Sequence, residues 1–140
     1  MELVITKTYS VVELADNQYY QVSSTDIIRA AMCREDVLGF NAVENGKIIG
    51  FALLRCFESD CWFLWNLLID IRYQGKGKGT QFVRLLIEHL RDQYGAKIVT
   101  TTYIFGNVAA KRLYESLGFT ETDVVCEDDV HEVNMRLDMN

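Results

Sequence analysis

Apolar and polar residues alternate with two different periods along this chain, so that stretches typical of strands and stretches typical of helices follow one another. Residues 2–6 indicate a short strand, and the segment after it, to about Glu35, is interpreted as one or two helices. Ser24 and Thr25 are candidate caps there, because short hydroxyl side chains bond the first free N–H groups of a helix. The apolar face predicted for this segment consists of Ile27, Ile28, Ala31 and Met32.

A pattern typical of strands begins at Leu38. Asn45-Gly46 is the strongest short signal for a hairpin turn, and residues 48–57 are predicted to return as the partner strand. After a polar turn, residues 62–71 are apolar at both alternating sets of positions, which is typical of a central strand covered on both faces. The sheet is therefore expected to carry other elements on each of its two faces.

A glycine-rich segment at residues 74–79 follows that strand and opens a helix that ends at Gly95. Apolar residues recur three and four positions apart along this helix, as expected of one buried face. These apolar positions are Val83, Leu86, Ile87 and Leu90.

The last third of the chain repeats the strand-helix order and closes with two strands. Residues 97–103 are rich in β-branched side chains and indicate a strand. A second helix is predicted to begin near Asn107 and to end at Gly118, and residues 119–125 and 130–137 are typical of a final antiparallel pair. The predicted fold class is therefore α/β (α+β), a mixed sheet with helices on both faces.

Composition and charge narrow the picture further. With 49% hydrophobic and 24% charged residues, the chain has an ordinary globular balance, and we expect one domain over residues 1–140. The net charge of −6 argues against nucleic acid as a partner, because binding to phosphates needs clustered Lys and Arg. It favours instead a cationic small molecule. No apolar stretch is long enough to cross a membrane.

The four cysteines, Cys33, Cys56, Cys61 and Cys126, form no CxxC pair, and no secretory leader is expected. They are interpreted as reduced and mostly buried thiols of a cytoplasmic protein. No metal site is expected, because His89 and His131 do not lie at ligand spacing from a cysteine pair.

The glycine-rich segment is the strongest chemical signal in the chain. A strand that passes through a glycine loop into a helix directs several backbone N–H groups at one point, which makes an anion site. Its residues are Gln74, Gly75, Lys76, Gly77, Lys78 and Gly79. The segment is neither a Walker loop nor a dinucleotide fingerprint, since Thr80 stands where the third glycine would be. A tight turn with solvated lysines is the alternative interpretation.

Two motifs resemble those of the GNAT acetyltransferases. Residues 74–79 resemble the family's (Arg/Gln)-x-x-Gly-x-(Gly/Ala) pyrophosphate loop, and residues 107–119 resemble its N-x-x-A-x-x-L-Y-E-x-x-G-F signature at every defined position. The resemblance covers nearly the whole chain, most loosely before Leu38. It implies the GNAT fold, with a mostly antiparallel sheet of six to seven strands, and acetyl-CoA as co-substrate. One departure is Ile71, where many relatives carry proline.

The resemblance also implies roles for single residues. The strand segment Leu67, Leu68 and Ile69 would offer backbone groups to the pantetheine arm and the thioester carbonyl. Tyr114 would be the general acid that protonates the leaving thiolate, and Asn107 would contact the coenzyme arm. Each also has a purely structural interpretation, because the leucines and Tyr114 are typical of a core and Asn is a favoured helix cap.

The acceptor is predicted to be a primary amine that attacks the thioester directly. Residues 62–77 resemble bacterial spermine and spermidine acetyltransferases, which implies a polyamine such as spermidine or spermine. An aromatic groove would hold its alkyl-ammonium chain. The candidate groove residues are Trp62, Trp65, Tyr19 and Tyr20. The alternatives are another amine, such as an aminoglycoside, an amino acid or a protein lysine, and a non-catalytic module that binds acetyl-CoA.

An alkylamine is mostly protonated near neutral pH, so a base is also expected. Carboxylates are the candidates, and the sequence does not choose among them. Glu58 and Asp60 are taken as nearest to the acceptor cleft, with Glu13, Asp16, Glu35 and Asp36 as further candidates. A homodimer is expected by resemblance alone.

Overall fold

The computed structural model describes residues 1–9, 23–127 and 130–139. Over these ranges the chain forms one seven-stranded sheet in the order β1-β2-β3-β4-β5-β7-β6, in which β4 and β5 are parallel and all other neighbours are antiparallel. The strands are β1 (Glu2–Thr6), β2 (Val37–Glu44), β3 (Lys47–Glu58), β4 (Cys61–Ile69), β5 (Ile98–Ile104), β6 (Thr120–Glu127) and β7 (Val130–Asp138). The helices are α1 (Thr25–Ala31), η2 (Ile71–Tyr73), α2 (Lys78–Tyr94) and α3 (Val108–Ser116).

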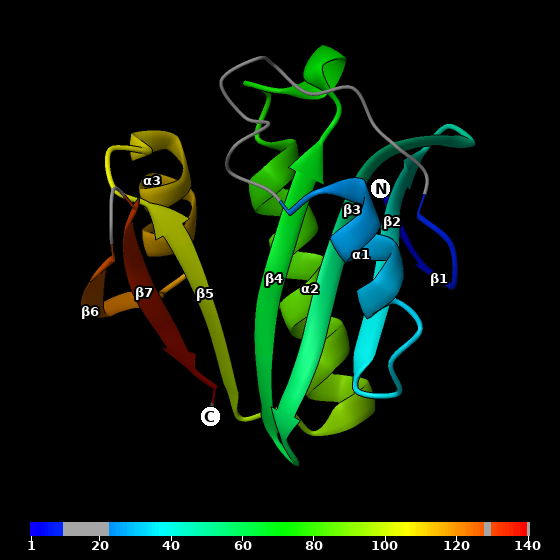
Figure 1. The fold of residues 1–140 in the computed structure, drawn as a ribbon. Helices are drawn as coiled ribbons and strands as arrows, with labels where there is room; N and C mark the ends of the chain where they lie inside the picture. Colours follow the sequence, from blue (N-terminus) through cyan, green and yellow to red (C-terminus); the bar gives the residue numbers. More distant parts are fainter. Residues whose placement is uncertain (10–22, 128–129, 140) are drawn as a thin grey trace.

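Helices cover both faces of the sheet, as predicted, and Figure 1 shows α1 in front of it and α2 behind it. On the α1 face, Ile28 and Ala31 pack against Phe51, Leu53 and Leu68. On the opposite face, α2 and α3 bury the larger cluster. Its helical members are Phe82, Val83, Leu86, Leu90 and Tyr114. The predicted mixed, mostly antiparallel sheet of six to seven strands is therefore confirmed.

The first helix is shorter than the sequence pattern suggested. Ser24 is its N-cap, as predicted, and the Ser24 hydroxyl accepts a hydrogen bond from the Ile27 N–H at 3.3 Å. The helix ends at Ala31 rather than near Glu35, and two turns are enough to bury only Ile28 and Ala31. Ile27 is 51% exposed, so its place on the predicted apolar face is wrong. The remainder of the predicted helical segment, residues 10–22, lies outside the described residues.

The predicted hairpin between β2 and β3 is confirmed. Asn45 and Gly46 have φ angles of 50° and 76°, and two positive φ angles are what a tight two-residue hairpin turn needs. The central strand β4 ends at Ile69, two residues before the predicted end at Ile71. It stops there because the Asp70 carboxylate accepts the Arg72 N–H and caps the short helix η2.

A β-bulge at Trp65 exchanges the two faces of β4. Leu64 pairs with Leu54 and Asn66 pairs with Leu53, so Trp65 has no partner in β3. As a result Leu64 packs on the α2 face, whereas Leu68, four residues later, packs on the α1 face. A regular strand would place both on the same face.

The four cysteines are free, but the interpretation that most of them are buried is wrong. Only Cys61 is buried, because Cys33 follows the end of the short helix α1 and Cys126 lies on the edge strand β6. Within the described ranges, no helix is long and apolar enough to span a membrane. The same ranges contain no group of three His, Cys, Asp or Glu side chains placed to hold a metal ion.

Candidate active site

The parallel strands β4 and β5 pair at one end only. Their register runs from Cys61 opposite Ile98 to Leu64 opposite Thr101, after which β4 and β5 no longer pair with each other. Figure 1 shows them diverging toward the loop that follows β4. A cleft of about 860 Å³ lies where they separate. The divergence leaves backbone groups of β4 without the strand partner that a closed sheet would supply.

The cleft is lined from both faces of the sheet. On the face of α2 and α3 it is bounded by the loop after β4, the start of α2 and one side of α3. Thr102 lies on the other face, because it alternates with Thr101 and the core residue Tyr103 along β5. The residues that line the cleft from the α1 side include Ser23, Phe63, Trp65, Thr102 and Glu132. A substrate bound between the strands would therefore contact side chains from both faces.

The loop after β4 is built for an anion. Gly75 and Gly77 have φ angles of 73° and 74°, and a Cβ atom added to either would meet nothing within 4 Å. Gly77 caps α2 without any side-chain hydrogen bond, so the first N–H groups of α2 remain available. The helix dipole adds partial positive charge at the same point. This geometry suits a phosphate, and phosphate binding by the loop stays a prediction.

Gly79 has a different reason to be glycine. A Cβ atom there would lie 2.9 Å from Leu113 Cδ1, so the glycine allows α2 and α3 to approach each other beside the cleft. It lines the cleft together with Gly75 and Gly77. The prediction that all three glycines serve the approach of a phosphate therefore stays a prediction for Gly75 and Gly77, whose geometry suits it, whereas the contact of Gly79 is with helix α3.

The polar side chains of the loop differ in what they do. Gln74 lines the cleft, and its Nε2 donates to the Ile69 carbonyl oxygen at 2.8 Å, which ties the loop to the end of β4. Lys78 also lines the cleft, but its Nζ lies 2.7 Å from Glu44 Oε1 on β2. Lys76 is exposed and is not among the lining residues. Backbone N–H groups, more than the lysines, make this anion site.

A glycine substitution tests that conclusion. Gly77→Ala is expected to weaken acetyl-CoA binding about tenfold, because an L-residue at φ 74° strains the cap by roughly 1–2 kcal/mol and moves the loop N–H groups. Gly46→Ala is the matched control, since Gly46 has φ 76° and equally open space but lies in the β2–β3 hairpin. Calorimetric titration with CoA should find both variants less stable and only Gly77→Ala impaired in binding. Equal affinities in the two variants would contradict the role of the loop.

The strand segment Leu67, Leu68 and Ile69 lines the cleft, as predicted. The Asp70 N–H donates to the Ile49 carbonyl oxygen at 2.8 Å and so points toward β3. Because successive backbone groups of a strand point to opposite sides, Leu67 and Ile69 direct theirs into the cleft and Leu68 directs its own toward β3. Polar backbone groups along an extended ligand fit the amide-containing pantetheine arm of CoA.

Tyr114 lies on α3 and lines the cleft with only 6% of its surface exposed. Burial raises the pKa of its hydroxyl, and a hydrogen bond with the Thr101 side chain offsets part of that rise. The ring packs edge-on against Phe119 with 5.5 Å between centroids. A raised pKa keeps the phenol protonated at neutral pH, as an acid requires.

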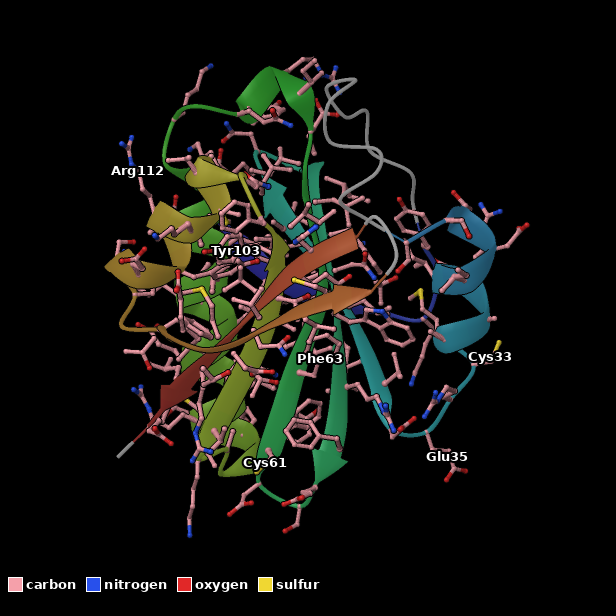
Figure 2. All side chains as sticks on the ribbon, turned by 60° about the vertical axis from the view of Figure 1, so that its left-hand side comes forward. Cys33, Glu35, Cys61, Phe63, Tyr103 and Arg112 are labelled. Atoms are coloured by element: carbon pink, nitrogen blue, oxygen red, sulfur yellow. The ribbon has the colours of Figure 1, made fainter. Side chains whose placement is uncertain are left out.

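Asn107 both caps α3 and lines the cleft. Its Oδ1 accepts a hydrogen bond from the Ala110 N–H at 3.1 Å, so the predicted structural role is confirmed. Lys111 lies in the first turn of α3 and does not line the cleft. Its Nζ lies 3.9 Å from Glu115 Oε1 and 3.6 Å from Glu121 Oε1. Arg112 does line the cleft, and Figure 2 shows it at the outer end of α3.

Tyr103 is a second tyrosine of the cleft, which the sequence interpretation did not single out. Its hydroxyl donates to Glu121 Oε1 at 2.8 Å. Burial, followed by the nearby Glu121 carboxylate, raises the pKa of Tyr103 to about 12. The hydroxyl is thus committed to Glu121, which leaves Tyr114 as the tyrosine suited to donate a proton in the cleft.

Of the predicted groove residues that the structure describes, one lines the cleft and one does not. Trp65 lines the cleft on the α1 side, whereas Trp62 is a core residue that packs against Tyr94, with ring centroids 5.1 Å apart. The prediction for Trp62 is wrong because residues three apart in a strand point to opposite faces, so that Trp62 packs under α2 whereas Trp65 faces α1. Tyr19 and Tyr20 lie outside the described residues. Phe63 also lines the cleft, although the sequence interpretation did not select it.

Three of the carboxylates proposed from the sequence, Glu58, Asp60 and Asp36, do not line the cleft. Glu58 and Asp60 flank the turn between β3 and β4, next to Cys61, which Figure 2 places at the opposite end of the sheet from Arg112. The pKa of Asp36 is lowered by a hydrogen bond from Arg34 and a further one from Arg55.

Glu35, a further candidate, does not line the cleft either. Glu35 is exposed, and Figure 2 shows it at the outer edge of the molecule; Glu13 and Asp16 lie outside the described residues. Among the residues that are described, Glu132 on β7 is the only acidic residue that lines the cleft. The available signal was its alternation with the apolar residues Val133 and Met135.

Sequence comparison identifies the family. The family model of the acetyltransferase (GNAT) family matches residues 6–119. The chain belongs to this family. The fold of this GNAT acetyltransferase resembles the structure of a GNAT family acetyltransferase from Elizabethkingia anophelis with acetyl-CoA bound. The TM-score is 0.75, the identity is 15%, and the match covers 98% of each chain. The predicted GNAT fold is confirmed, and family membership supports the predicted acetyltransferase class and acetyl-CoA as its co-substrate.

Two curated relatives act on different amines. The ribosomal protein bS18 alanine N-acetyltransferase of Escherichia coli (strain K12) is 37% identical over 93 residues, which are 64% of this chain and 60% of that protein. The spermine/spermidine N(1)-acetyltransferase of Bacillus subtilis (strain 168) is 29% identical over 119 residues, which are 76% of this chain and 75% of that protein. The first match thus spans less than two thirds of its relative, and the relatives leave the acceptor of this GNAT acetyltransferase open.

Proposed function

We propose that this protein transfers the acetyl group of acetyl-CoA to a primary amine, and that the amine belongs to a polyamine such as spermidine or spermine. The observation that carries the transferase is the juxtaposition of three parts in one cleft. These are an uncapped helix start behind a glycine loop, unpaired backbone groups of β4, and the buried hydroxyl of Tyr114.

Each part has a step in direct transfer. The first N–H groups of α2 hold the pyrophosphate, and the backbone of Leu67 and Ile69 orients the acyl arm between β4 and β5. As the amine attacks, negative charge develops on the carbonyl oxygen, and a fixed N–H of β4 stabilises it. The C–N bond forms, the C–S bond breaks, and the sulfur takes a proton from Tyr114. The proton that the amine nitrogen loses passes to water and restores the Tyr114 phenol, so that the products are the amide and the free thiol. A phenol of pKa 10 or above is a weak acid, but a thiolate of pKa about 8.5 needs only modest assistance to leave.

Three observations favour a polyamine as acceptor. The protein carries a net charge of −6, which attracts a polycation. The α1 side of the cleft presents aromatic side chains, Phe63 and Trp65, together with the carboxylate of Glu132, and both kinds of group bind alkylammonium ions. The Bacillus subtilis spermine/spermidine N(1)-acetyltransferase matches a larger share of this chain than the Escherichia coli relative does.

The amino-terminal amine of a protein is the second candidate. The Escherichia coli alanine N-acetyltransferase has the higher identity of the two relatives, 37% over its matching segment. A cleft that is lined from both faces of the sheet would also accept the end of a peptide chain. A non-catalytic acetyl-CoA-binding role is a third possibility, which the retained Tyr114 disfavours. We further propose a cytoplasmic location and a homodimer, both by analogy with the family.

The acceptor is identified by release of free thiol from acetyl-CoA. The purified protein is incubated with spermidine, spermine, lysine, an aminoglycoside, and a peptide that begins with alanine. Release that depends on spermidine or spermine, with KM at least tenfold below that of the peptide, is the expected result. A lower KM for the peptide would move the assignment to protein amino termini, and tight binding of acetyl-CoA without turnover of any amine would overturn the transferase.

A further inference from the structure

We infer that Glu132 is the side chain that binds the ammonium group of the acceptor and so selects amines for this cleft. The inference rests on the proposed function, because it names the group that receives the substrate of that reaction. Glu132 lies on β7 opposite Ile104, near the end of β5 that has separated from β4.

The side chain of Glu132 faces the acceptor side of the sheet. Val133 and Met135, which follow it on β7, are both buried in the cluster under α2 and α3. Because side chains of a strand alternate, Glu132 points to the opposite face, on which Thr102 and Phe63 line the cleft. The coenzyme phosphates bind on the α2 side, so Glu132 lies across the sheet from them.

Glu132 differs from the other carboxylates near the functional elements in having no partner. Glu44 is paired with Lys78, Asp70 with Arg72, and Glu121 accepts from Tyr103. Within the described ranges, the carboxylate of Glu132 makes no hydrogen bond and no ion pair. Its side chain is half-buried. A partly desolvated carboxylate at the wall of a cleft, without a cation from its own chain, is suited to a cation from a ligand.

The cleft is therefore polarised. Its α2 end offers helix N–H groups, which suit the phosphates of the donor, and its α1 side offers Glu132, which suits a cationic acceptor. Phe63 and Trp65 line the same side as Glu132 and can contact the methylene groups beside the ammonium. An acceptor that carries a carboxylate at this point would be repelled by Glu132. This arrangement favours binding of the donor on the α2 side of the cleft and binding of the acceptor on the α1 side.

Glu132→Gln is the test, because it removes the charge and keeps the shape. We expect KM for spermidine to rise about 10- to 100-fold, as for loss of a charge-assisted hydrogen bond, with kcat changed less than threefold and Kd for CoA unchanged. Glu88→Gln is the matched control, since Glu88 is an exposed glutamate on α2 away from the cleft and its loss changes the net charge equally. This control should leave KM within twofold of the native value.

Binding is also measured without turnover, by calorimetric titration of CoA-loaded protein with spermidine and with butylamine. Weaker binding of both amines to Glu132→Gln than to Glu88→Gln supports the inference, and Glu132→Asp should restore part of the affinity. Equal affinities for the two glutamine variants would overturn it, even if the native protein acetylates spermidine. Absence of acetyl transfer to every amine, with amine binding still dependent on Glu132, would instead overturn the proposed function and leave the ammonium site standing.

Discussion

Tyr114→Phe is expected to lower kcat for acetyl transfer about 100- to 1000-fold, which is the lower part of the range for loss of a general acid. The lower part is expected because a thiolate leaves more readily than an alkoxide or an amide ion. The substitution removes one oxygen from a side chain that is 6% exposed and keeps its packing against Phe119. Thiol release under saturating acetyl-CoA and amine measures the effect.

The control for this substitution is Tyr94→Phe. Tyr94 lies at the end of α2, is 41% exposed and packs against Trp62 rather than the cleft, so its loss of a hydroxyl should leave kcat within twofold. Loss of the Tyr114 hydroxyl is expected to reduce stability by about 1 kcal/mol, because a partner of Thr101 disappears. A Tyr114→Phe variant that folds, binds CoA and retains a third of native kcat would show that the leaving thiolate is protonated by something else.

The donor half of the site could be predicted from the sequence because it is local. The glycine loop and the start of α2 are contiguous in the chain, and the cap Asn107 lies only seven residues before Tyr114 on the same helix. Short-range geometry of this kind, a glycine turn into a helix and residues two turns apart on one face, is determined by backbone periodicity. The structure therefore brings together nearly every residue selected for the donor, with Lys76 as the exception.

The acceptor half could not be predicted because it depends on strand register. Because β4 is apolar on both faces, its sequence does not show which face Trp62 and Trp65 occupy, and it does not reveal the bulge at Trp65 that changes the faces of the residues after it. Glu58 and Asp60 lie at the turn before β4, at the end of that strand where β5 still pairs with it. Because a strand advances about 3.3 Å per residue, the length of β4 separates them from its cleft end. Glu132 enters the site only through the pairing of β5 with β7.

Gly50→Ala is expected to reduce both stability and coenzyme affinity, because Gly50 allows β3 to lie close against the functional end of β4. Gly50 pairs with Ile69, and a Cβ atom on it would lie 2.8 Å from the Leu68 carbonyl oxygen and 3.3 Å from Phe82 Cε2. The nearest obstacle is backbone, so β4 itself must shift. We expect a loss of about 2–3 kcal/mol, a fall in Tm of about 10 °C, and a Kd for acetyl-CoA raised at least tenfold.

Gly39→Ala separates simple overpacking from displacement of β4. Its Cβ atom would lie 2.7 Å from Met32 Cε, the end of a flexible side chain that can move aside, and 3.2 Å from the Thr6 carbonyl oxygen, at a position away from the cleft. Thermal unfolding and CoA titration of both variants should therefore show a smaller stability loss for Gly39→Ala, with affinity unchanged. If Gly50→Ala lost stability and kept its affinity, the backbone of Leu67 and Ile69 would tolerate a shift, and the coenzyme would depend on the loop and α2 instead.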